Sequence, residues 1–516
     1  METKLERLRG EKAQNDYFAT DHLKRDLKDR ALKSGGVTIL SRIFDHLTQL
    51  VGAVVLARLL TPEDFGLVAM VVAISGFFLM FKDLGLTDAT VQSEKLNQDQ
   101  VSTLFWINLI FSIIITVLFC LGAPLIAWFY NEPRLINITV ISSVTFILAG
   151  LSTQHIALLR RNMLFTKIAA IEMGAAFGST VIAIYLALKG AGYWSLVFRN
   201  ILVTIIVAFG AWIMCKWRPG LPVCKANVKP MVKFGANTMG FYLVNYFARN
   251  MDKALIGWKN GPVALGLYHK AFYLFVAPIN QLVIPLQSVA VSTLTKLRSE
   301  PQKFTRYYVK ALGYLAFIGM PMSAFIASAS GDLIAFLLGN KWIKAAEIFA
   351  ILGWAAGIQI IYSTQGWIYV SVGRADKWLR WGIVSSIFTV IGFFIGLPFG
   401  PKGIALAYTI TLYILVTPGL WYAGKLVGIS PYHIFDAVWK YYVSAAGAAF
   451  ITHYISGMNL TAHISIKVMI DMCVYVISYL VLLIIIFRST YPISQFIAII
   501  PKVVPSIKVK KRRLEK

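Results

Sequence analysis

Runs of about twenty apolar residues recur along the whole sequence, and they limit the possible folds more than any other feature. Of the 516 residues, 57% are hydrophobic and only 14% are charged, whereas a soluble chain is about a quarter charged. A helix needs about twenty apolar residues to cross a bilayer. Backbone polar groups must be paired inside lipid, and the alternation typical of a β-barrel is absent, so helices are the default. We therefore expect an all-α membrane protein.

The apolar runs predict about fourteen transmembrane helices. No loop between them is long enough to form a soluble domain. The approximate ranges are 35–60, 66–90, 103–129, 136–158, 168–188, 193–216, 231–257, 263–293, 307–330, 344–370, 378–397, 402–425, 434–456 and 466–488.

The positive charge is distributed unevenly over this predicted topology. The net charge of +26 would suit a nucleic-acid-binding protein, but its distribution argues against that class. Of the 50 Lys and Arg residues, 36 fall in the N-terminal segment, the even-numbered loops and the C-terminal tail, and 9 fall in the odd-numbered loops. This bias follows the positive-inside rule and predicts that both termini are cytoplasmic. The remaining 5 basic residues lie within spans, at Arg42, Lys82, Arg199, Arg249 and Lys270.

The sequence also repeats itself at an offset of 200 residues. TPEDFGL at 61–67 returns as GPVALGL at 261–267, with Pro, Gly and Leu in the same places. Lys33, Gly35 and Thr38 recur in the same register, which makes six identities in 35 positions, where chance gives roughly two or three. Six spans separate the copies, so the predicted repeat is parallel and its axis lies along the membrane normal. We expect the two heptapeptides to be outer turns, in which Pro starts the turn and Gly permits the tight return.

This repeat predicts two six-helix lobes around a central cavity, followed by two extra C-terminal helices. The predicted order is a cytoplasmic segment at 1–33, an N-lobe at 34–217, a cytoplasmic loop at 218–230, a C-lobe at 231–425, spans 13 and 14 at 426–488, and a basic cytoplasmic tail at 489–516.

A polar stripe runs along one face of the first span of each predicted lobe, at steps of four and three residues. Ionisable groups at membrane depth usually face a bundle interior or a water-filled cavity, so both stripes are predicted to line the central cavity. The alternative is that Arg42–Asp45 and Arg249–Asp252 are i,i+3 pairs that only neutralise each other. The stripes are Thr38, Arg42, Asp45, Gln49 and Gly52 in span 1, and Thr238, Tyr242, Asn245, Arg249 and Asp252 in span 7.

Further charged residues lie in neighbouring spans. Lys82, Asp83 and Asp88 stand near the inner end of span 2, where Lys82 can also extend to the cytoplasmic surface. Lys270 lies about two turns into span 8, and Arg199 lies near the outer end of span 6. Pro278 and Pro285 each remove a backbone donor, so span 8 is predicted to bend or break there and to serve as a hinge.

The chemistry of these groups favours an anionic ligand. Arg42, Arg249, Lys270, Lys82 and Arg199 suit a phosphate or diphosphate, which Arg engages through two parallel bonds. The acids Asp45, Asp83, Asp88 and Asp252 are candidates to carry a coupling ion, because protonation of one would switch off its salt bridge. We expect no cofactor, metal site or catalytic residue, since the sequence has no P-loop and no zinc-type cysteine spacing.

Two further groups of residues are interpreted as structural. His155 and Glu172 are isolated in spans 4 and 5 and are more often packing residues than sites. Aromatic residues near span ends are interpreted as membrane-interface residues. These are Trp128, Tyr130, Trp217 and Trp342.

The runs LARLLTPEDFGLVAM and FKDLGLTDATVQ, with the echo KALIGWKNGPVALGLYHKAFYLFVAP, resemble bacterial Wzx-like polysaccharide transporters, in particular the colanic-acid-exporter-like branch. These belong to the multidrug/oligosaccharidyl-lipid/polysaccharide flippase superfamily. The resemblance covers about 35–425 well and the last two spans loosely. It implies two six-helix bundles, a V-shaped central cavity and alternating access. It aligns no individual functional position.

The resemblance also implies a function. The cargo would be an oligosaccharide repeat unit on a polyprenyl diphosphate, moved to the outer leaflet of the bacterial inner membrane for lipopolysaccharide, capsule or colanic-acid-like polymers. A polysaccharide polymerase or copolymerase is a candidate partner, and no nucleic acid is expected. One alternative is a multidrug or organic-cation antiporter of the same superfamily, which would suit an acidic, aromatic cavity. A membrane polymerase or ligase is the other, and it would need a large polar loop.

Overall fold

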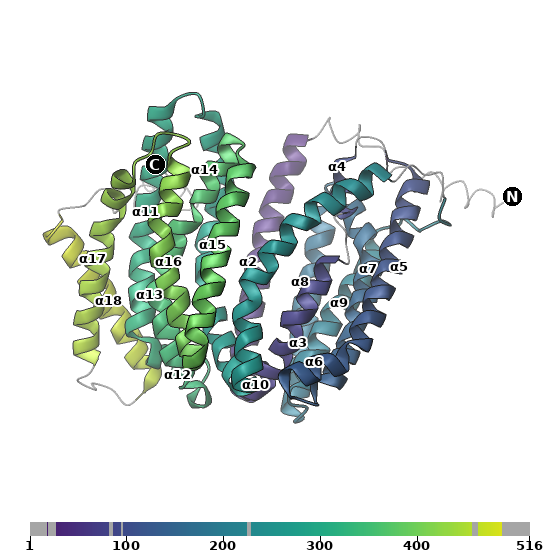
Figure 1. Ribbon diagram of the computed structural model, residues 1–516, viewed down its shortest axis with the longest axis horizontal. Coiled ribbons are helices and arrows are strands. Elements are labelled where there is room, and N and C mark those ends of the chain that lie inside the picture. Colours follow the sequence, from purple (N-terminus) through teal and green to yellow (C-terminus); the bar gives the residue numbers. More distant parts are fainter. Residues whose placement is uncertain are drawn as a thin grey trace, which may run out of the picture. The chain divides into compact units, whose positions relative to one another are not determined.

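The computed structural model describes residue 18 and residues 27–81, 86–93, 96–223, 229–456 and 463–487. It describes the backbone alone at 27–40, 80, 81, 88, 229–245 and 247–249. Within these ranges every regular element is a helix and none is a strand, which confirms the all-α prediction (Figure 1). The chain divides into two compact units, residues 1–269 and 270–516. The border lies inside one long helix, while the division into lobes at 218–230 stays a prediction.

The first unit is a bundle of long helices. The helices α5, α7, α8 and α9 run side by side, and α2 packs along α8 (Figure 1). The helices α3, α4 and α6 also contact α7. The elements are α2 (Leu27–Leu59), α3 (Pro62–Phe81), α4 (Leu86–Gln92), α5 (Gln98–Leu121), α6 (Ala123–Tyr130), α7 (Leu135–Arg161), α8 (Phe165–Leu188), α9 (Trp194–Met214) and the first part of α10 (Lys229–Lys296).

The second unit contains the end of α10 and a second bundle. In it α11 packs between α13 and α17, α16 packs between α13 and α15, and α18 packs on α17. The elements are α11 (Pro301–Ser328), α12 (Ser330–Leu337), η2 (Asn340–Trp342), α13 (Ala345–Ser363), α14 (Gln365–Val372), α15 (Ala375–Gly396), η3 (Leu397–Phe399), α16 (Gly400–Gly424), α17 (Pro431–Ser456) and α18 (Ile464–Ile485).

Each of the fourteen predicted spans coincides with a long helix, or with one of the two halves of α10. By length and composition, ten candidate spans are found among the described residues. Two of these are longer than one span: Asn250–Lys296 runs from the end of predicted span 7 through span 8, and Ala375–Gly424 covers predicted spans 11 and 12. The protein is therefore a multi-pass membrane protein, and the total of fourteen stays a prediction.

The heptapeptide TPEDFGL sets the start of α3. Thr61 caps the helix: its Oγ1 accepts from the Asp64 N–H at 3.3 Å, and its own backbone N–H donates to Asp64 Oδ2 at 2.9 Å. Pro62 takes the first helical position, where its missing N–H costs nothing. In the second copy, Gly261 has φ 78° and ψ −177°, the one non-helical conformation within α10, and Pro262 starts the next helical part. Both heptapeptides thus stand at the start of a helical part, with Pro in its first position.

The backbone of α10 is not broken at Pro278 or Pro285. Both lie in continuous helix, and only Gly261 departs from helical dihedral angles. The expectation of a break at these prolines is therefore wrong; a bend and the proposed hinge role stay predictions. Neighbouring helices can satisfy the backbone groups that a proline leaves unpaired, so a membrane helix tolerates proline without breaking.

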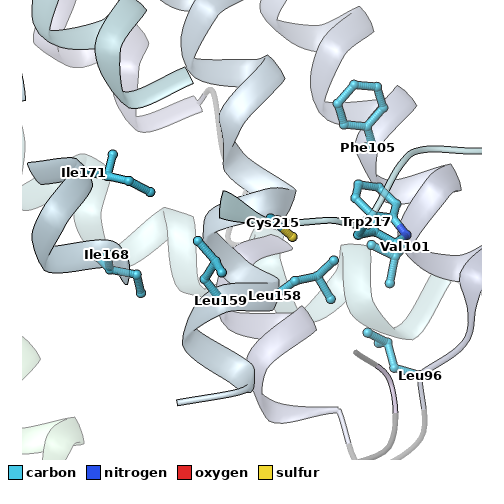
Figure 2. Close-up of a cluster of buried hydrophobic side chains, with 9 residues drawn as sticks. All are labelled: Leu96, Val101, Phe105, Leu158, Leu159, Ile168, Ile171, Cys215 and Trp217. Carbon is cyan, nitrogen blue, oxygen red and sulfur yellow. The ribbon is translucent and has the colours of Figure 1, made fainter. Parts of the chain in front are cut away.

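A hydrophobic cluster joins the end of α9 to α5, α7 and α8. Trp217 is fully buried in it, and Figure 2 shows the indole beside Val101. Its Nε1 donates to Gln98 Oε1 at 2.5 Å. Trp342 and Tyr130 are buried as well, so the interpretation of these three as membrane-interface residues is wrong; Trp128 is 78% exposed. A position at the end of a span does not reveal whether a loop folds back and buries its aromatic ring.

The chain after α9 is bound to α5 over residues 215–223, which we name the clasp segment. Gly220 N donates to Ser102 Oγ at 2.9 Å, and Gly220 O accepts from Trp106 Nε1 at 2.8 Å. Further along, Val223 N donates to Thr103 Oγ1 at 3.1 Å. The contacts continue through the last described residue before 224–228.

Candidate functional site

The charged stripe of span 1 lies on α2, which packs against α8. Arg42 and Gln49 are exposed, and Asp45 is half-buried. Arg42 and Asp45 form no ion pair, so the described geometry does not support simple mutual neutralisation of this pair. Both lie close enough to act on the charge of Glu172 on α8, as does Arg160; from the sequence alone, Glu172 is interpreted as more often a packing residue than a site. The first unit therefore gathers Arg42, Asp45 and Glu172 into one charged group between two helices.

Arg199 reaches this helix pair from α9. Its Nε donates to Thr180 Oγ1 on α8 over a long 3.4 Å. Thr180 is buried, and its side chain lies where a Cβ on Gly52 of α2 would stand. Gly52 therefore lets α2 approach α8 closely. At this position the stripe packs against a neighbouring helix and is not exposed. Arg199 and the span 1 stripe come together on α8.

Of the two candidate acids whose side chains the structure describes, Asp45 and Asp252, the more buried is Asp252 on the first part of α10, with 2% of its surface exposed. Its Oδ2 accepts a hydrogen bond from the Tyr268 hydroxyl at 2.8 Å. Its Oδ1 is buried and has no hydrogen-bond partner among the described residues. A buried carboxylate is costly while charged unless both oxygens gain donors in place of water. Protonation or a bound cation would relieve that cost.

Sequence reasoning missed Tyr268, although a signal for it existed. Asp252 lies nine residues before Gly261 and Tyr268 lies seven after it. At 1.5 Å per residue both sit roughly 11 to 14 Å along their helices from the turn, and side chains at equal depth in a hairpin can meet. The equivalent positions in the first copy hold Gly52 and Val68, so this acid and tyrosine pair exists in the second copy alone.

The two heptapeptides pack directly against each other within the first unit. A Cβ on Gly66 would collide with the Pro262 carbonyl, and a Cβ on Gly266 would collide with the Pro62 carbonyl. Both glycines lie inside helices, one turn after the proline. The expectation that they permit a tight turn is therefore wrong. Their role is to let the two helix starts approach each other. Each glycine packs against the proline of the other copy of the repeat, so the two copies contact each other through equivalent residues.

The helix start of α3 and the first part of α10 also meet further in. The Tyr246 hydroxyl donates to Ala73 O on α3 at 2.7 Å, and its ring lies against Gly76. Near the turn, Gly257 leaves room for the Tyr130 ring. These contacts hold the helix that carries Asp252 against the first copy of the repeat.

The loops beside α3 and α7 carry an exposed charge network. Arg134 bonds to Glu63 at 2.6 Å and to Glu132 at 2.7 Å and 2.8 Å. The hydrogen bonds from Arg134 hold the pKa of Glu132 below its ordinary value, and the two glutamates raise the pKa of Arg134. Arg134 thereby ties the start of α3 to the 132–134 connection.

For some of the remaining predicted residues the structure describes the side chain, and for others it does not. Lys270 opens the second unit; it is buried, and its Nζ lies 5.8 Å from the centre of the Tyr273 ring. Asp88 lies on α4, and Arg161 on α7 donates to carbonyls at the end of this helix, Thr90 and Val91, and to the carbonyl of Ser93 just after it. Lys82 and Asp83 are outside the described residues. For Asp88, Thr38, Thr238, Tyr242, Asn245 and Arg249 only the backbone is described.

In the part of the chain that is described, no three His, Cys, Asp or Glu side chains are grouped so that they could hold a metal ion. The candidate chemistry of the first unit is instead a buried carboxylate and tyrosine pair, Asp252 and Tyr268, and a more exposed group of charges on α2 and α8. Such groups can bind and release an ion or orient an anion, and they show no nucleophile with an adjacent base.

Two curated relatives resemble the chain over most of its length. The teichuronic acid biosynthesis protein TuaB of Bacillus subtilis (strain 168) is 23% identical over 437 residues, covering 83% of this chain and 89% of the relative. The lipopolysaccharide biosynthesis protein WzxC of Escherichia coli (strain K12) is 23% identical over 356 residues, covering 67% and 71%.

Solved structures share the fold. Lipid II flippase MurJ in its inward closed conformation superposes with a TM-score of 0.70 at 17% identity, covering 89% of this chain and 99% of that one. An inward-facing multidrug resistance MATE family transporter of the MOP superfamily gives a TM-score of 0.60 at 14% identity, covering 74% and 95%. At these identities the likeness shows the fold alone.

The model of one family, described as polysaccharide biosynthesis protein, matches residues 55–347, which is more than half of the chain. The chain therefore belongs to this polysaccharide biosynthesis protein family.

Proposed function

We propose that this protein is a flippase. It moves an oligosaccharide repeat unit, linked to a polyprenyl diphosphate, from the cytoplasmic to the outer leaflet of the bacterial inner membrane. The observation that carries the proposal is the family match together with the MurJ-like fold over 89% of the chain. Relatives named for teichuronic acid and lipopolysaccharide biosynthesis support a polysaccharide precursor as cargo. The role is transport rather than catalysis, with both termini cytoplasmic and a polymerase as a possible partner.

The cationic residues would hold the diphosphate of the cargo. Arg42 stands exposed on α2, Arg199 meets α8 at Thr180, and Lys270 is buried at the start of the second unit. Arginine suits this task because its planar guanidinium can offer two parallel donors to one phosphoryl group. Arg249 and Lys82 complete the set proposed from the sequence.

The buried acid Asp252 would couple transport to an ion gradient. One of its oxygens already accepts from Tyr268, and the other is unpaired among the described residues. Uptake of a proton or a sodium ion would neutralise the carboxylate. This would lower the free-energy cost of keeping Asp252 buried between the two parts of α10. Asp45 would serve the same purpose in the first copy, with Asp83 and Asp88 as further candidates.

The flippase proposal is tested by asking which leaflet holds the cargo. The gene would be deleted in its native host, and lipid-linked oligosaccharides would be probed in spheroplasts and in opened membranes with a glycosidase that cannot cross the bilayer. We expect the cargo to accumulate and to be cleaved only after the membrane is opened. Re-expression of wild-type protein should restore cleavage in spheroplasts, whereas Arg42→Ala should restore at most about a tenth of it.

Lys189→Ala is the matched control, since Lys189 is an exposed cation outside the proposed cavity set. It should complement like the wild type. Cargo that reaches the outer face normally while its polymerisation fails would overturn the proposal in favour of a polymerase or ligase. Unchanged glycolipid with increased sensitivity to organic cations would instead favour the antiporter alternative.

A further inference from the structure

The second unit contains a pocket of about 460 Å³ where three helices end and one begins. It is lined by Arg298 after α10, by Val372 and Arg374 at the end of α14, and by Val427 after α16, with Phe304 in the first turns of α11. Phe304 and Val372 are buried, so part of the lining is fixed and apolar, while both arginines are exposed. Small-molecule sites are typically about 300–1,000 Å³, so the pocket can hold more than a single ion.

The two arginines come from different parts of the chain and meet at this pocket. The Arg298 guanidinium makes no hydrogen bond or ion pair with any residue that the structure describes, and its Nη1 lies 4.0 Å from where a Cβ on Gly373 would stand. Arg374 bonds to both oxygens of Asp376, through Nε at 2.8 Å and Nη2 at 2.9 Å. This pair fixes the plane of the Arg374 guanidinium and uses two of its five N–H groups. The rest remain for a ligand.

The start of α11 adds a third favourable feature. Pro301 lines the pocket as the first residue of this 28-residue helix, and Glu300 before it makes no side-chain cap bond. Pro301 has no N–H, and the Glu300 N–H donates to Leu297 O. The amides left at this helix start are therefore those of Gln302 and Lys303, and the helix dipole is positive at that end. An uncapped helix start beside two guanidinium groups is an environment that favours an anion.

The ordinary interpretation of arginines beside helix ends is that they cap backbone carbonyls. The contacts of these side chains do not fit it. The Arg374 side chain bonds to a carboxylate, and the Arg298 side chain bonds to no carbonyl among the described residues. Asp376 offsets one of the two positive charges, so a ligand with a single phosphoryl group would meet a net charge of about +1.

We propose that this arginine pocket binds a phosphoryl group, either that of a lipid or that of a free phosphate compound. The loops that line it, at 297–300, 373–374 and 425–430, are even-numbered loops of the predicted topology, so the site would lie at the cytoplasmic membrane surface. There the phosphoryl group can enter between the guanidinium groups while an attached apolar chain lies toward the bilayer. The site is separate from Arg42, Arg199 and Asp252, which all lie in the first unit.

The test is a binding titration of the purified full-length protein in a neutral maltoside detergent. The three probes are inorganic phosphate, dihexanoyl phosphatidylglycerol and farnesyl diphosphate. We expect at least one to bind, and we expect Arg298→Ala and Arg374→Ala each to weaken that binding at least about tenfold, since each removes a charge-assisted hydrogen bond. Arg374→Lys, which keeps the charge but not the planar fork, should fall between wild type and Arg374→Ala.

Arg380→Ala is the matched control, because Arg380 is an exposed arginine on α15 that does not line the pocket. It should change binding less than about twofold, as expected for a screened surface charge. The probe that binds identifies the ligand of the pocket. Binding of phosphatidylglycerol alone indicates a lipid headgroup, and binding of farnesyl diphosphate alone indicates a prenyl diphosphate. Binding of inorganic phosphate indicates a free anion. The proposal fails if no probe binds, if the pocket variants bind like wild type, or if Arg380→Ala loses as much.

A thermal melt of every variant shows whether it is folded, and Arg298→Lys keeps the positive charge at this position. Together they separate lost binding from lost folding. This readout needs no transport, so the pocket can be disproved while the flippase proposal stands. Equally, a protein that flips no oligosaccharide would still bind the phosphoryl probe if the pocket assignment is right.

Discussion

Gly66 lies so close to Pro262 that a Cβ on the glycine would collide with the proline carbonyl. The same relation holds between Gly266 and Pro62, the residues that lie 200 positions from Gly66 and from Pro262. The obstacle in both cases is backbone rather than the end of a flexible side chain, so it cannot rotate away. The repeated heptapeptide is therefore a contact between its own two copies.

Gly66→Ala should destabilise the protein, and Gly266→Ala should do so by a similar amount. An added methyl group forces the two helix starts apart, and overpacking of this kind costs about 1–3 kcal/mol. The measurement is the thermal unfolding midpoint of each purified variant in detergent. Gly174→Ala on α8 is the control, because a Cβ there meets no atom within 4 Å and alanine favours the helix. Melting of Gly66→Ala at or above the wild-type temperature would contradict the contact.

Asp252→Asn should abolish the dependence of transport on an ion gradient. Asparagine can still accept the hydrogen bond from Tyr268 and so preserves packing, but it cannot exchange a proton or balance a cation. We expect the outer-leaflet cargo of a complemented deletion strain to fall at least about tenfold and to become insensitive to ionophores. Tyr268→Phe should cause a smaller loss, and Tyr185→Phe, at an exposed tyrosine, should cause none. Full ionophore-sensitive transport by Asp252→Asn would remove this acid from the coupling proposal.

Trp217→Ala should release the clasp segment from α5. The indole is fully buried and hydrogen-bonded to Gln98, and truncation of a buried tryptophan costs about 3–5 kcal/mol. Hydrogen exchange should therefore accelerate at residues 217–223, where Gly220 and Val223 donate to serine and threonine on α5. Trp128→Ala is the matched control, since Trp128 is 78% exposed. Unchanged protection in Trp217→Ala would show that the indole does not hold the segment.

The Glu132–Arg134 contact should make a small pH-dependent contribution to stability. Arg134 holds the pKa of Glu132 below its unfolded value, which is about 4.3. The contribution is therefore fully present above the unfolded pKa and is lost as the pH falls through the lower folded pKa. Because the network is exposed at Arg134, its size should not exceed about 1 kcal/mol.

The check is the difference in melting temperature between wild type and Glu132→Gln as a function of pH. It should be present at pH 7 and vanish toward pH 3. Glu300→Gln, which removes the exposed pair with Lys303, is the comparison for an ordinary surface pair. A difference that grows on acidification would give the wrong sign and exclude the assignment.

The helices and their order could be predicted because the apolar periodicity is a local signal. Each predicted span has a long helix at its place, and Pro62 and Pro262 mark the starts of two helical parts, as the sequence predicted. The role of Gly66 could not be predicted. A glycine one turn after a proline looks the same in sequence whether it serves a turn or packs against the carbonyl of the proline in the other copy of the repeat.

The charged residues show the same limit. The spacing of Arg42 and Asp45 placed them on one face of a helix, but only the packing of α2 on α8 brings Glu172 into the same group. Asp252 was identified from its depth in an apolar run, whereas its partner Tyr268 required the position of the turn at Gly261. Trp217 was misinterpreted because a loop that folds back onto α5 leaves no periodic pattern.

The clasp segment also sets a length. Because the chain stays bound to α5 as far as Val223 and α10 begins at Lys229, only six residue steps connect the two. A fully extended chain covers at most about 3.6 Å per step, so the start of α10 can lie no farther than roughly 22 Å from Val223. In any rearrangement during a transport cycle, the start of α10 must stay within that distance of Val223. It can move farther from α5 only if the hydrogen bonds of the clasp segment break.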